Sequence, residues 1–489
     1  MIVSTDPATV VAREWRTVLH GRPTPAARTY PTEDPCTGKD LAAVPDCGAD
    51  EVNEAVEAAQ RAQPAWAALA PRERAARVRA FAEVLRDHRE ELATLDAVDG
   101  GFPLGVMRAD VDAAANLLEI MCDLALDLGG RTIPATAEHL HYTLQRPYGV
   151  VARIVPFNHP LFFAASKLAA PLVAGNAVVL KAPDQTPLSA LRMAELFDEA
   201  LPQDLCVVLT GQGGVAGRAL VRHPLIRRIG FIGSAATGQL IQREAAETGV
   251  KYVSLELGGK NAMVVMPDAD PSAAAGAAVA GMNFTATSGQ SCGSTSRLLV
   301  HEDVAEAVLD ALLPQVRRIR VGFPLDEGTD MGPVISNAQL EKAQRAVEAG
   351  TRHGARVAAG GGRPAGLPPG GYFLEPTVLV DVAPDNPVAR QEVFGPVLAV
   401  TTFQDEEEAV RLANAVDYGL TASIWTKDVT RAHRMAGRLD AGYIWINGTS
   451  RHFWGVPFGG VKSSGVGREE SLEELISYTE TKAVSVVLA

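Results

Sequence analysis

Short apolar runs alternate with longer amphipathic segments through the middle of the chain. Four such runs occupy residues 150–155, 177–180, 206–209 and 229–232, and helix-length segments such as 188–201 separate them. Runs of this length, rich in β-branched residues and apolar on both faces, are typical of parallel strands buried between helices. The pattern predicts a doubly wound, Rossmann-like α/β sheet.

A second series of apolar runs begins after residue 258 and predicts a second α/β unit. Its expected strands are 262–266, 297–300, 423–425 and 443–446, and its expected helices are 272–288 and 303–318. Before the first sheet, apolar spacing predicts helices starting near Asp50, after Pro71 and at about 110–127. The apolar run 483–488 has no later strand as partner, so it is expected to pair with the extended segment 139–146 or with another subunit.

Composition excludes several classes of function. The 489 residues carry a net charge of −13, which argues against nonspecific nucleic-acid binding. Five cysteines stand far apart and form no CxxC pair, so neither a disulfide framework nor a zinc site is expected, and no other metal site is predicted. Residues 1–7 lack the pattern of a signal peptide, and the apolar runs are too short to cross a membrane. A cytoplasmic protein without a membrane partner is the expectation.

Polar and glycine residues follow each run of the first sheet. Asn158 follows the first run, Lys181 and Asp184 follow the second, and Gly233-Ser234 precedes a helix after the fourth. Ligands of parallel sheets bind beyond these strand ends, and a helix N-terminus suits phosphate. The GxGxxG spacing is absent, so an ordinary strand-to-helix loop is the competing interpretation of Gly233-Ser234.

Cys292 stands between glycines and small polar residues, in Gly289-Gln290-Ser291-Cys292-Gly293. Such surroundings leave the sulfur accessible, but a nucleophilic thiol needs a base or donors near it. Glu256 is a candidate, although 36 residues of chain separate it from Cys292. Taken alone, Cys292 also fits a small buried hydrophobic residue, and Glu256 fits a charge at a strand end.

Together, these segments resemble the NAD(P)-dependent aldehyde dehydrogenase superfamily. The resemblance covers nearly the whole chain and keeps the family's order and approximate spacing. The matching segments are Pro156-Phe157-Asn158, Lys181 with Asp184, Phe231-Ile232-Gly233-Ser234, Leu255-Glu256-Leu257-Gly258-Gly259-Lys260, Gly289-Gln290-Ser291-Cys292, Glu392-Val393-Phe394-Gly395-Pro396 and Pro457 to Gly465.

The resemblance implies three structural units. Residues 1–125 and 148–257 would form an NAD-binding domain, and residues 258–470 a catalytic domain. Residues 126–147 and 471–489 would form an oligomerisation arm of β-strands. The family implies a homodimer or homotetramer, in which an exchanged edge strand would use the apolar C-terminal run.

The resemblance also assigns catalytic roles. Cys292 would attack the aldehyde carbonyl and form a thiohemiacetal, and the Asn158 amide with the Cys292 N–H would stabilise the oxyanion. Hydride transfer to the nicotinamide would leave a thioester. Glu256 would activate the water that hydrolyses it. Lys167 and Glu469 match positions linked to the path of water and protons.

The cofactor residues implied by the resemblance point to NAD. Lys181 and Asp184 would hold the adenosine ribose, although glutamate is usual in place of Asp184. A carboxylate there accepts ribose hydroxyls and repels the 2′-phosphate of NADP, so NADP is the weaker expectation. Gly233 and Ser234 would face the pyrophosphate. The nicotinamide end would be held by Glu392, Phe394 and Phe157, the last at a position where tryptophan is common.

The expected substrate pocket is apolar and aromatic, which favours a hydrophobic or aromatic aldehyde. Arg451 offers an alternative, a charge that would bind a semialdehyde carboxylate. The family's phenylalanine is replaced by His159. The pocket residues expected are Phe162, Phe163, Met282, Phe284, Ser291 and Phe453.

Two other functions remain open. A CoA-acylating semialdehyde dehydrogenase would pass the acyl group to CoA, but Glu256 argues for water as the acceptor. A binding protein of the same fold would lack the chemistry, and the presence of Cys292, Glu256 and Asn158 argues against it. Cys292 could also support a thiol-dependent esterase side activity.

Overall fold

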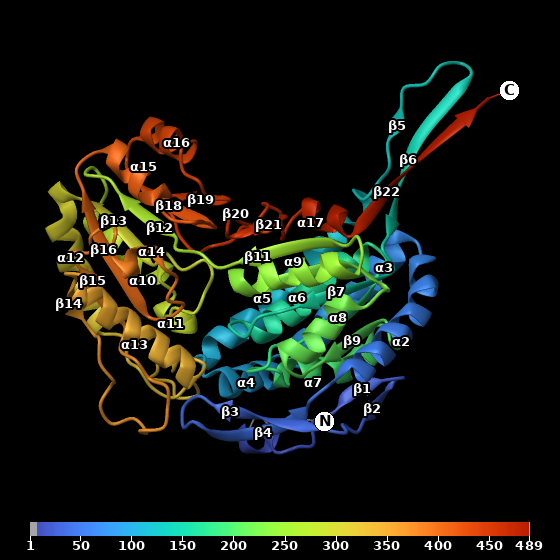
Figure 1. Ribbon diagram of the computed structural model, residues 1–489, viewed down its shortest axis with the longest axis horizontal. Coiled ribbons are helices and arrows are strands. Elements are labelled where there is room, and N and C mark those ends of the chain that lie inside the picture. Colours follow the sequence, from blue (N-terminus) through green and yellow to red (C-terminus); the bar gives the residue numbers. More distant parts are fainter. Residues whose placement is uncertain (1–6, 489) are drawn as a thin grey trace.

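The computed structural model describes residues 7–488, so the expectation about residues 1–6 lies outside the described part. Two sheets of mainly parallel strands stand side by side, and a long β arm projects from one end (Figure 1). The two predicted Rossmann-like α/β sheets are confirmed.

The first sheet has six strands in the order β21-β11-β10-β7-β8-β9. Neighbouring strands are parallel except β21, which runs antiparallel to β11. Because β21 comes from near the C-terminus, this sheet is completed only when the chain returns to it. The strands are β7 (Val150–Ile154), β8 (Ala177–Lys181), β9 (Cys206–Leu209), β10 (Ile226–Gly233), β11 (Tyr252–Leu257) and β21 (Gly465–Val466).

Helices from before and between these strands cover the sheet. A predicted helix at 110–127 is corrected to α5, which begins at Leu104 after Pro103 and ends at Asp123. The pattern analysis missed α4, which is separated from α3 by the single residue His88 and is buried on most of its surface. The helices are α2 (Ala49–Ala67), α3 (Pro71–Asp87), α4 (Arg89–Gly100), α5 (Leu104–Asp123), α6 (Pro160–Val173), α7 (Leu188–Leu196), α8 (Arg218–Arg222) and α9 (Ala235–Thr248).

The second sheet has seven strands in the order β14-β15-β16-β13-β12-β18-β19. Only β14 is antiparallel to its neighbour. The strands are β12 (Ala262–Val265), β13 (Arg297–His301), β14 (Arg356–Ala359), β15 (Thr377–Val380), β16 (Val397–Phe403), β18 (Thr421–Trp425) and β19 (Tyr443–Ile446).

One predicted helix of this unit is broken. The expected helix 272–288 consists of α10 (Pro271–Gly281) and the single turn α11 (Phe284–Thr287), because Asn283 adopts a left-handed conformation with φ 54°. The break redirects the chain towards Cys292. The remaining helices of this unit are α12 (Glu302–Arg317), α13 (Asn337–Arg352), α14 (Pro387–Arg390), α15 (Glu406–Asn414) and α16 (Val429–Ala436).

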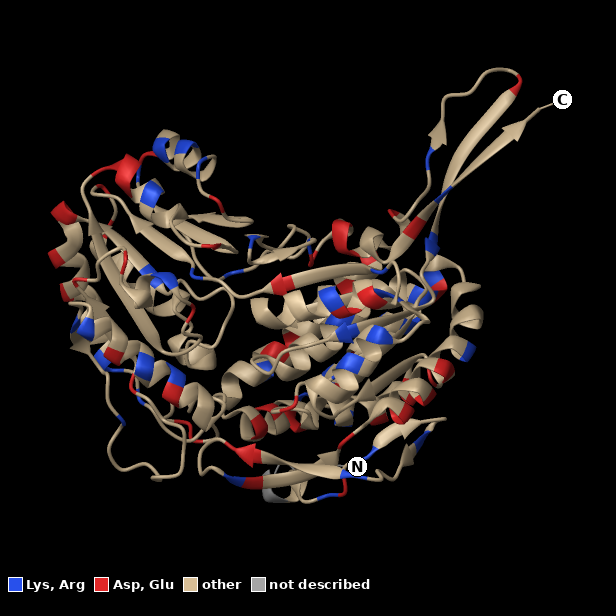
Figure 2. Cartoon of the chain, viewed as in Figure 1, with Lys and Arg blue, Asp and Glu red and all other residues tan. Residues whose placement is uncertain are grey.

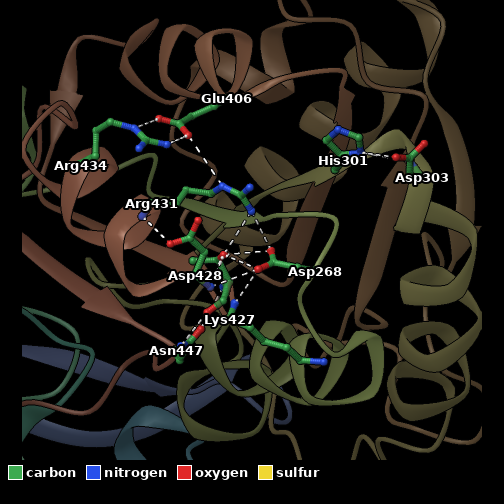
Figure 3. A network of polar contacts seen from close by, with 10 residues as sticks. Asp268, His301, Asp303, Glu406, Lys427, Asp428, Arg431, Arg434 and Asn447 are labelled. Atoms are coloured by element: carbon green, nitrogen blue, oxygen red, sulfur yellow. Dashed lines mark hydrogen bonds and ion pairs between the residues drawn. The ribbon is translucent and has the colours of Figure 1, made fainter.

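A polar network ties α15 and α16 to the second sheet (Figure 3). Asp268, which follows β12, accepts hydrogen bonds from Thr426 Oγ1 at 2.9 Å, from the Lys427 N–H at 3.0 Å and from Arg431 at 3.0 Å. Glu406 of α15 pairs with Arg434 of α16 at 2.5 Å. These groups satisfy one another, so we assign this network to stability.

The projecting arm contains β5 (Thr132–Ile133), β6 (His139–Pro147) and the C-terminal β22 (Thr479–Val487). β22 pairs antiparallel with β6 along its whole length, from Thr479–Pro147 to Val487–His139. The C-terminal run was expected to pair with the segment 139–146 or with another subunit, and here it pairs with β6 of its own chain. Within the segment 471–489, α17 (Leu472–Ser477) packs against α6 rather than in the arm.

The remaining elements are short and mostly peripheral. Acidic and basic residues are interspersed along the visible helices (Figure 2). Among residues 7–488, no helix combines the length and the apolarity that a membrane crossing requires. The short peripheral elements are α1 (Pro7–Val11), β1 (Thr17–Leu19), β2 (Arg22–Thr24), β3 (Thr29–Asp34), β4 (Lys39–Pro45), β17 (Tyr418–Gly419) and β20 (Val461–Lys462).

Candidate active site

Two cavities meet at Cys292 and Glu256. The larger, of about 600 Å³, follows the carboxyl ends of the first sheet's strands, and Asn158 also lines it. The smaller, of about 240 Å³, opens on the other side of the thiol. The fold therefore brings together the three residues predicted to be catalytic, from the loop before β13, the end of β11 and the β7–α6 loop.

Buried hydrogen bonds fix the loop that carries Cys292. Gln290 accepts a bond from the Ile335 N–H at 3.0 Å, and Asn261 donates to the Cys292 carbonyl at 2.7 Å. Gly289 has φ 72°, and a Cβ there would lie 2.5 Å from the Gly395 carbonyl oxygen. Only glycine fits at position 289, so steric constraints explain the glycine three residues before Cys292.

The Asn158 amide is positioned by the same loop. Its Nδ2 donates to the Gln290 carbonyl at 2.7 Å, and the side chain is 2% exposed. The second Nδ2 hydrogen remains free to donate, and the Cys292 N–H has no acceptor among the described residues. These two donors can stabilise an oxyanion formed beside Cys292.

Burial controls the electrostatics of Glu256. The side chain is 4% exposed, and its Oε1 has no hydrogen-bond partner within the described chain. Burial, followed by the charge of Glu469, raises its pKa well above the ordinary value, while Lys167 opposes the shift. A carboxyl with a raised pKa is a stronger base once ionised.

A buried ion cluster lies behind Glu256. Glu469 Oε1 accepts from Arg153 at 3.0 Å, and Glu469 Oε2 lies 2.8 Å from Lys167 Nζ. Although burial opposes ionisation, the two cations lower the pKa of Glu469 to about 2. Lys167 and Glu469 both line the smaller cavity, so their charges act on Glu256 across a short distance.

The Cys292 thiol also has a pKa well above its ordinary value. Burial is the main cause, and the carboxylates of Glu256 and Glu392 add to it, while the Gly293 N–H opposes the shift. The thiol is therefore protonated at neutral pH, and forming the thiolate requires a base or a bound positive charge.

These pKa shifts predict an alkaline optimum. In the roles predicted for them, Glu256 would react deprotonated and Cys292 as the thiolate, and both raised pKa values keep these forms scarce at low pH. We expect the kcat/KM for aldehyde oxidation to rise with pH through the neutral range. A profile that stays flat from about pH 6 to about pH 9 would contradict this expectation.

The larger cavity fits a dinucleotide at its outer end. Lys181 and Asp184 form an ion pair there, and the Gly213 N–H donates to Asp184 Oδ2 at 3.2 Å. Ser234 caps α9 by accepting from the Thr237 N–H at 3.2 Å. The N–H groups of the next two residues have no acceptor in the described chain, so the helix N-terminus can bind a phosphate.

The inner end of this cavity is lined by rings and a carboxylate. Phe157 and Phe394 meet edge to face with centroids 5.9 Å apart. Glu392 accepts from the Gly259 N–H at 2.9 Å, and a Cβ on Gly258 would lie 2.2 Å from Glu392 Oε2. The glycine pair thus lets the carboxylate approach the backbone. Lys181, Asp184, Phe157, Gly233, Ser234, Glu392 and Phe394 all line one continuous cavity.

The structure corrects half of the predicted substrate pocket. Phe162, Phe163 and Ser291 line the smaller cavity. Met282 and Phe284 are instead fully buried in the core of the second sheet, because the break at Asn283 turns them inward. Phe453 is 52% exposed and stacks with Arg451, so neither lines the cavity.

Sequence reasoning missed part of this cavity. His452, Trp454 and Phe458 line it from the loop after β19, and Asp110 and Glu470 line it from α5 and from the loop before α17. The direction of each aromatic side chain in this loop depends on the loop conformation, which the sequence pattern does not give. The His159 substitution was the one signal of a polar wall.

Comparisons with known proteins cover nearly the entire chain. The model of the Aldehyde dehydrogenase family matches residues 23–484. Aldehyde dehydrogenase tropH of Talaromyces stipitatus is 42% identical over 465 residues, which is 94% of this chain and 90% of that protein.

Solved structures give the same result. The NAD+ complex of an aldehyde dehydrogenase from Bacillus cereus is 37% identical, with a TM-score of 0.96 and coverage of 100% of this chain and 99% of that chain. An NADP-dependent enzyme from E. coli is 34% identical, with a TM-score of 0.94 and coverage of 97% and 98%.

Proposed function

The chain belongs to the aldehyde dehydrogenase family and is an NAD(P)-dependent aldehyde dehydrogenase, and on that premise we propose that it oxidises a hydrophobic or aromatic aldehyde to the carboxylic acid with NAD. The observation that supports this proposal most directly is the meeting of two cavities at Cys292. One cavity fits a dinucleotide, and the other is lined by aromatic rings.

In the proposed mechanism, the Cys292 thiol first loses its proton to solvent, and the thiolate Sγ then bonds to the aldehyde carbon. The carbonyl oxygen becomes an oxyanion, which the Asn158 amide and the Cys292 N–H stabilise. A nicotinamide held in the larger cavity would supply the hydride acceptor, and loss of hydride from that carbon would leave a thioester on Cys292. Lys181, Asp184, Ser234 and Glu392 would hold the dinucleotide in the larger cavity.

Glu256 then removes a proton from water, whose oxygen attacks the thioester carbon. The carbon–sulfur bond breaks, the acid leaves and the thiolate returns. The cluster of Lys167 and Glu469 sets the charge around Glu256, which is a positioning role rather than contact with the reacting atoms.

The proposed preference for NAD is supported by Asp184, whose carboxylate lines the larger cavity beside Lys181. We expect Asp184→Ser to raise the ratio of kcat/KM for NADP to that for NAD about tenfold, because it removes a charge that repels the 2′-phosphate and releases Lys181 from its ion pair. Asp310→Ser, on an exposed face of α12, is the control. An unchanged or lower ratio would contradict the proposed role.

The test of the proposed function is formation of reduced nicotinamide by the purified protein. The panel combines NAD or NADP with aliphatic, aromatic and carboxylated aldehydes, with and without CoA. Fast turnover of apolar and aromatic aldehydes without CoA supports the proposal. Turnover that requires CoA would replace it with the acylating function, and preference for carboxylated aldehydes would favour a semialdehyde substrate.

We also propose a homodimer or homotetramer assembled through the arm. The arm projects from the body, and Leu140, Leu144 and Val487 on β6 and β22 are exposed apolar side chains. Such an edge is suited to contact with another subunit. A cytoplasmic, reducing location is proposed because all five cysteines are free.

A further inference from the structure

Two histidines in the smaller cavity are each held by a carboxylate. His159 Nδ1 lies 2.7 Å from Asp110 Oδ2, and His452 Nδ1 lies 2.9 Å from Glu470 Oε2. All four side chains line the cavity beside Cys292. Neither Nε2 atom has a hydrogen-bond partner among the described residues.

Aromatic rings connect the two histidines. Successive centroid distances are 6.3 Å from His159 to Phe162, 6.1 Å to Trp454 and 6.1 Å to His452. Phe458 then stacks on His452 at 4.3 Å. The rings fix both imidazoles and give an aromatic substrate flat surfaces to pack against.

The carboxylate beside each Nδ1 determines whether the free Nε2 accepts or donates a hydrogen bond. A carboxylate only accepts hydrogen bonds, so Nδ1 carries the proton in each pair. The Nε2 of a neutral imidazole then accepts a hydrogen bond from a hydroxyl. If the hydroxyl proton moves to Nε2, the imidazolium donates to the resulting oxyanion. In both protonation states, one proton lies between Nε2 and the ligand oxygen, and a phenolic hydroxyl can supply this proton.

The charges in the cavity do not favour a carboxylate ligand. Lys167 is its one lysine or arginine, and Glu469 already neutralises it. Arg451, expected as a carboxylate anchor, lies outside the cavity over Phe453. Asp110 and Glu470 add negative charge beside the histidines, which repels a second carboxylate.

From these contacts we propose, on the basis of the proposed function, that the substrate is an aromatic aldehyde carrying a ring hydroxyl, and that His159 and His452 are the specificity-determining residues that bind this hydroxyl. Each histidine offers one binding position for the hydroxyl. The ring position of the preferred hydroxyl therefore depends on which of the two histidines it contacts.

The test compares benzaldehyde with its 2-, 3- and 4-hydroxy, methoxy and carboxy derivatives. We expect at least one hydroxy isomer to exceed its methoxy counterpart in kcat/KM about tenfold or more, because methoxy has no proton to donate. His159→Phe or His452→Phe should remove this preference. The readout is the ratio of kcat/KM for the hydroxy isomer to kcat/KM for its methoxy counterpart. A substitution that lowers the activity towards both aldehydes equally leaves this ratio unchanged.

Three controls complete the experiment. His433→Phe, on an exposed face of α16, should leave the ratio unchanged. Asp110→Asn and Glu470→Gln keep each imidazole and remove its carboxylate, and they should lower the same ratio even where a phenylalanine variant fails to fold. Circular dichroism reports folding for each variant.

The proposal is overturned if no hydroxy isomer is preferred, if the preference survives all four substitutions, or if a carboxybenzaldehyde is the best substrate. Failure of the proposed function gives a different result, since no aldehyde would then be oxidised. Oxidation of benzaldehyde without a hydroxyl preference would leave the dehydrogenase intact and remove only the roles of the histidines.

Discussion

Cys292→Ala is expected to lower the turnover of every aldehyde by about 10⁴-fold or more, because no other group can form the covalent intermediate. Water cannot replace the thiol. The hydrate that water forms with the aldehyde is not bonded to the protein, so it is not held beside the two oxyanion donors. Formation of reduced nicotinamide measures the loss. Cofactor binding should be retained, because Cys292 lines only the inner end of the larger cavity, and a fluorescence titration with reduced nicotinamide can check this.

Cys206→Ala is the matched control for this substitution. Cys206 is buried in β9 and lines neither cavity, so its loss should not affect turnover. Among the five cysteines, Cys292 alone is partly exposed, and the other four are buried. Alkylation by iodoacetamide should therefore modify Cys292 first, and bound cofactor should change its rate. Cys292→Ala protein that still oxidised aldehydes at a comparable rate would refute the proposed nucleophile.

Glu256→Gln is expected to separate the two halves of the reaction. The amide has nearly the same shape but cannot take a proton from water, so thioester hydrolysis should slow by about 10²- to 10⁴-fold. Acylation needs no water, and rapid mixing should reveal a burst of about one reduced nicotinamide per active site. Mass spectrometry should then find the acyl group on Cys292.

The absence of a burst would mean that Glu256 is also needed to form the thiolate. Glu306→Gln, on an exposed face of α12, is the control and should retain both phases. Steady turnover of Glu256→Gln at the normal rate would refute the role of Glu256. Addition of CoA to the acylated variant shows whether another nucleophile can reach the thioester, which tests the acylating alternative.

Most strands could be predicted from the sequence because their signal is local. The runs that became β7, β8, β9 and β12 are apolar on both faces, as expected for strands covered by helices on each side. Helix ends were less predictable. α4 buries polar as well as apolar residues, among them Glu91, Asp96 and Asp99, so its sequence lacks the amphipathic pattern of a surface helix.

The proposed catalytic residues could be named from the sequence because two of them stand near glycines in short motifs. Gly289 lies against the Gly395 backbone and Gly258 against the Glu392 carboxylate, and Cys292 and Glu256 stand near them in sequence. The substrate pocket was not predictable in the same way. Met282 and Phe284 have the composition of a pocket wall but point into the core, because Asn283 breaks the helix.

The sequence by itself determined the two α/β units, the aldehyde dehydrogenase family and the three proposed catalytic residues, because those depend on local hydrophobic pattern and on short motifs. Only the tertiary structure decided which side chains face the substrate, since His159 meets Asp110 across 49 residues and His452 meets Glu470 across 18. It also decided the pKa of Glu256, because burial and the charges of Lys167 and Glu469 arise only when separate segments pack together.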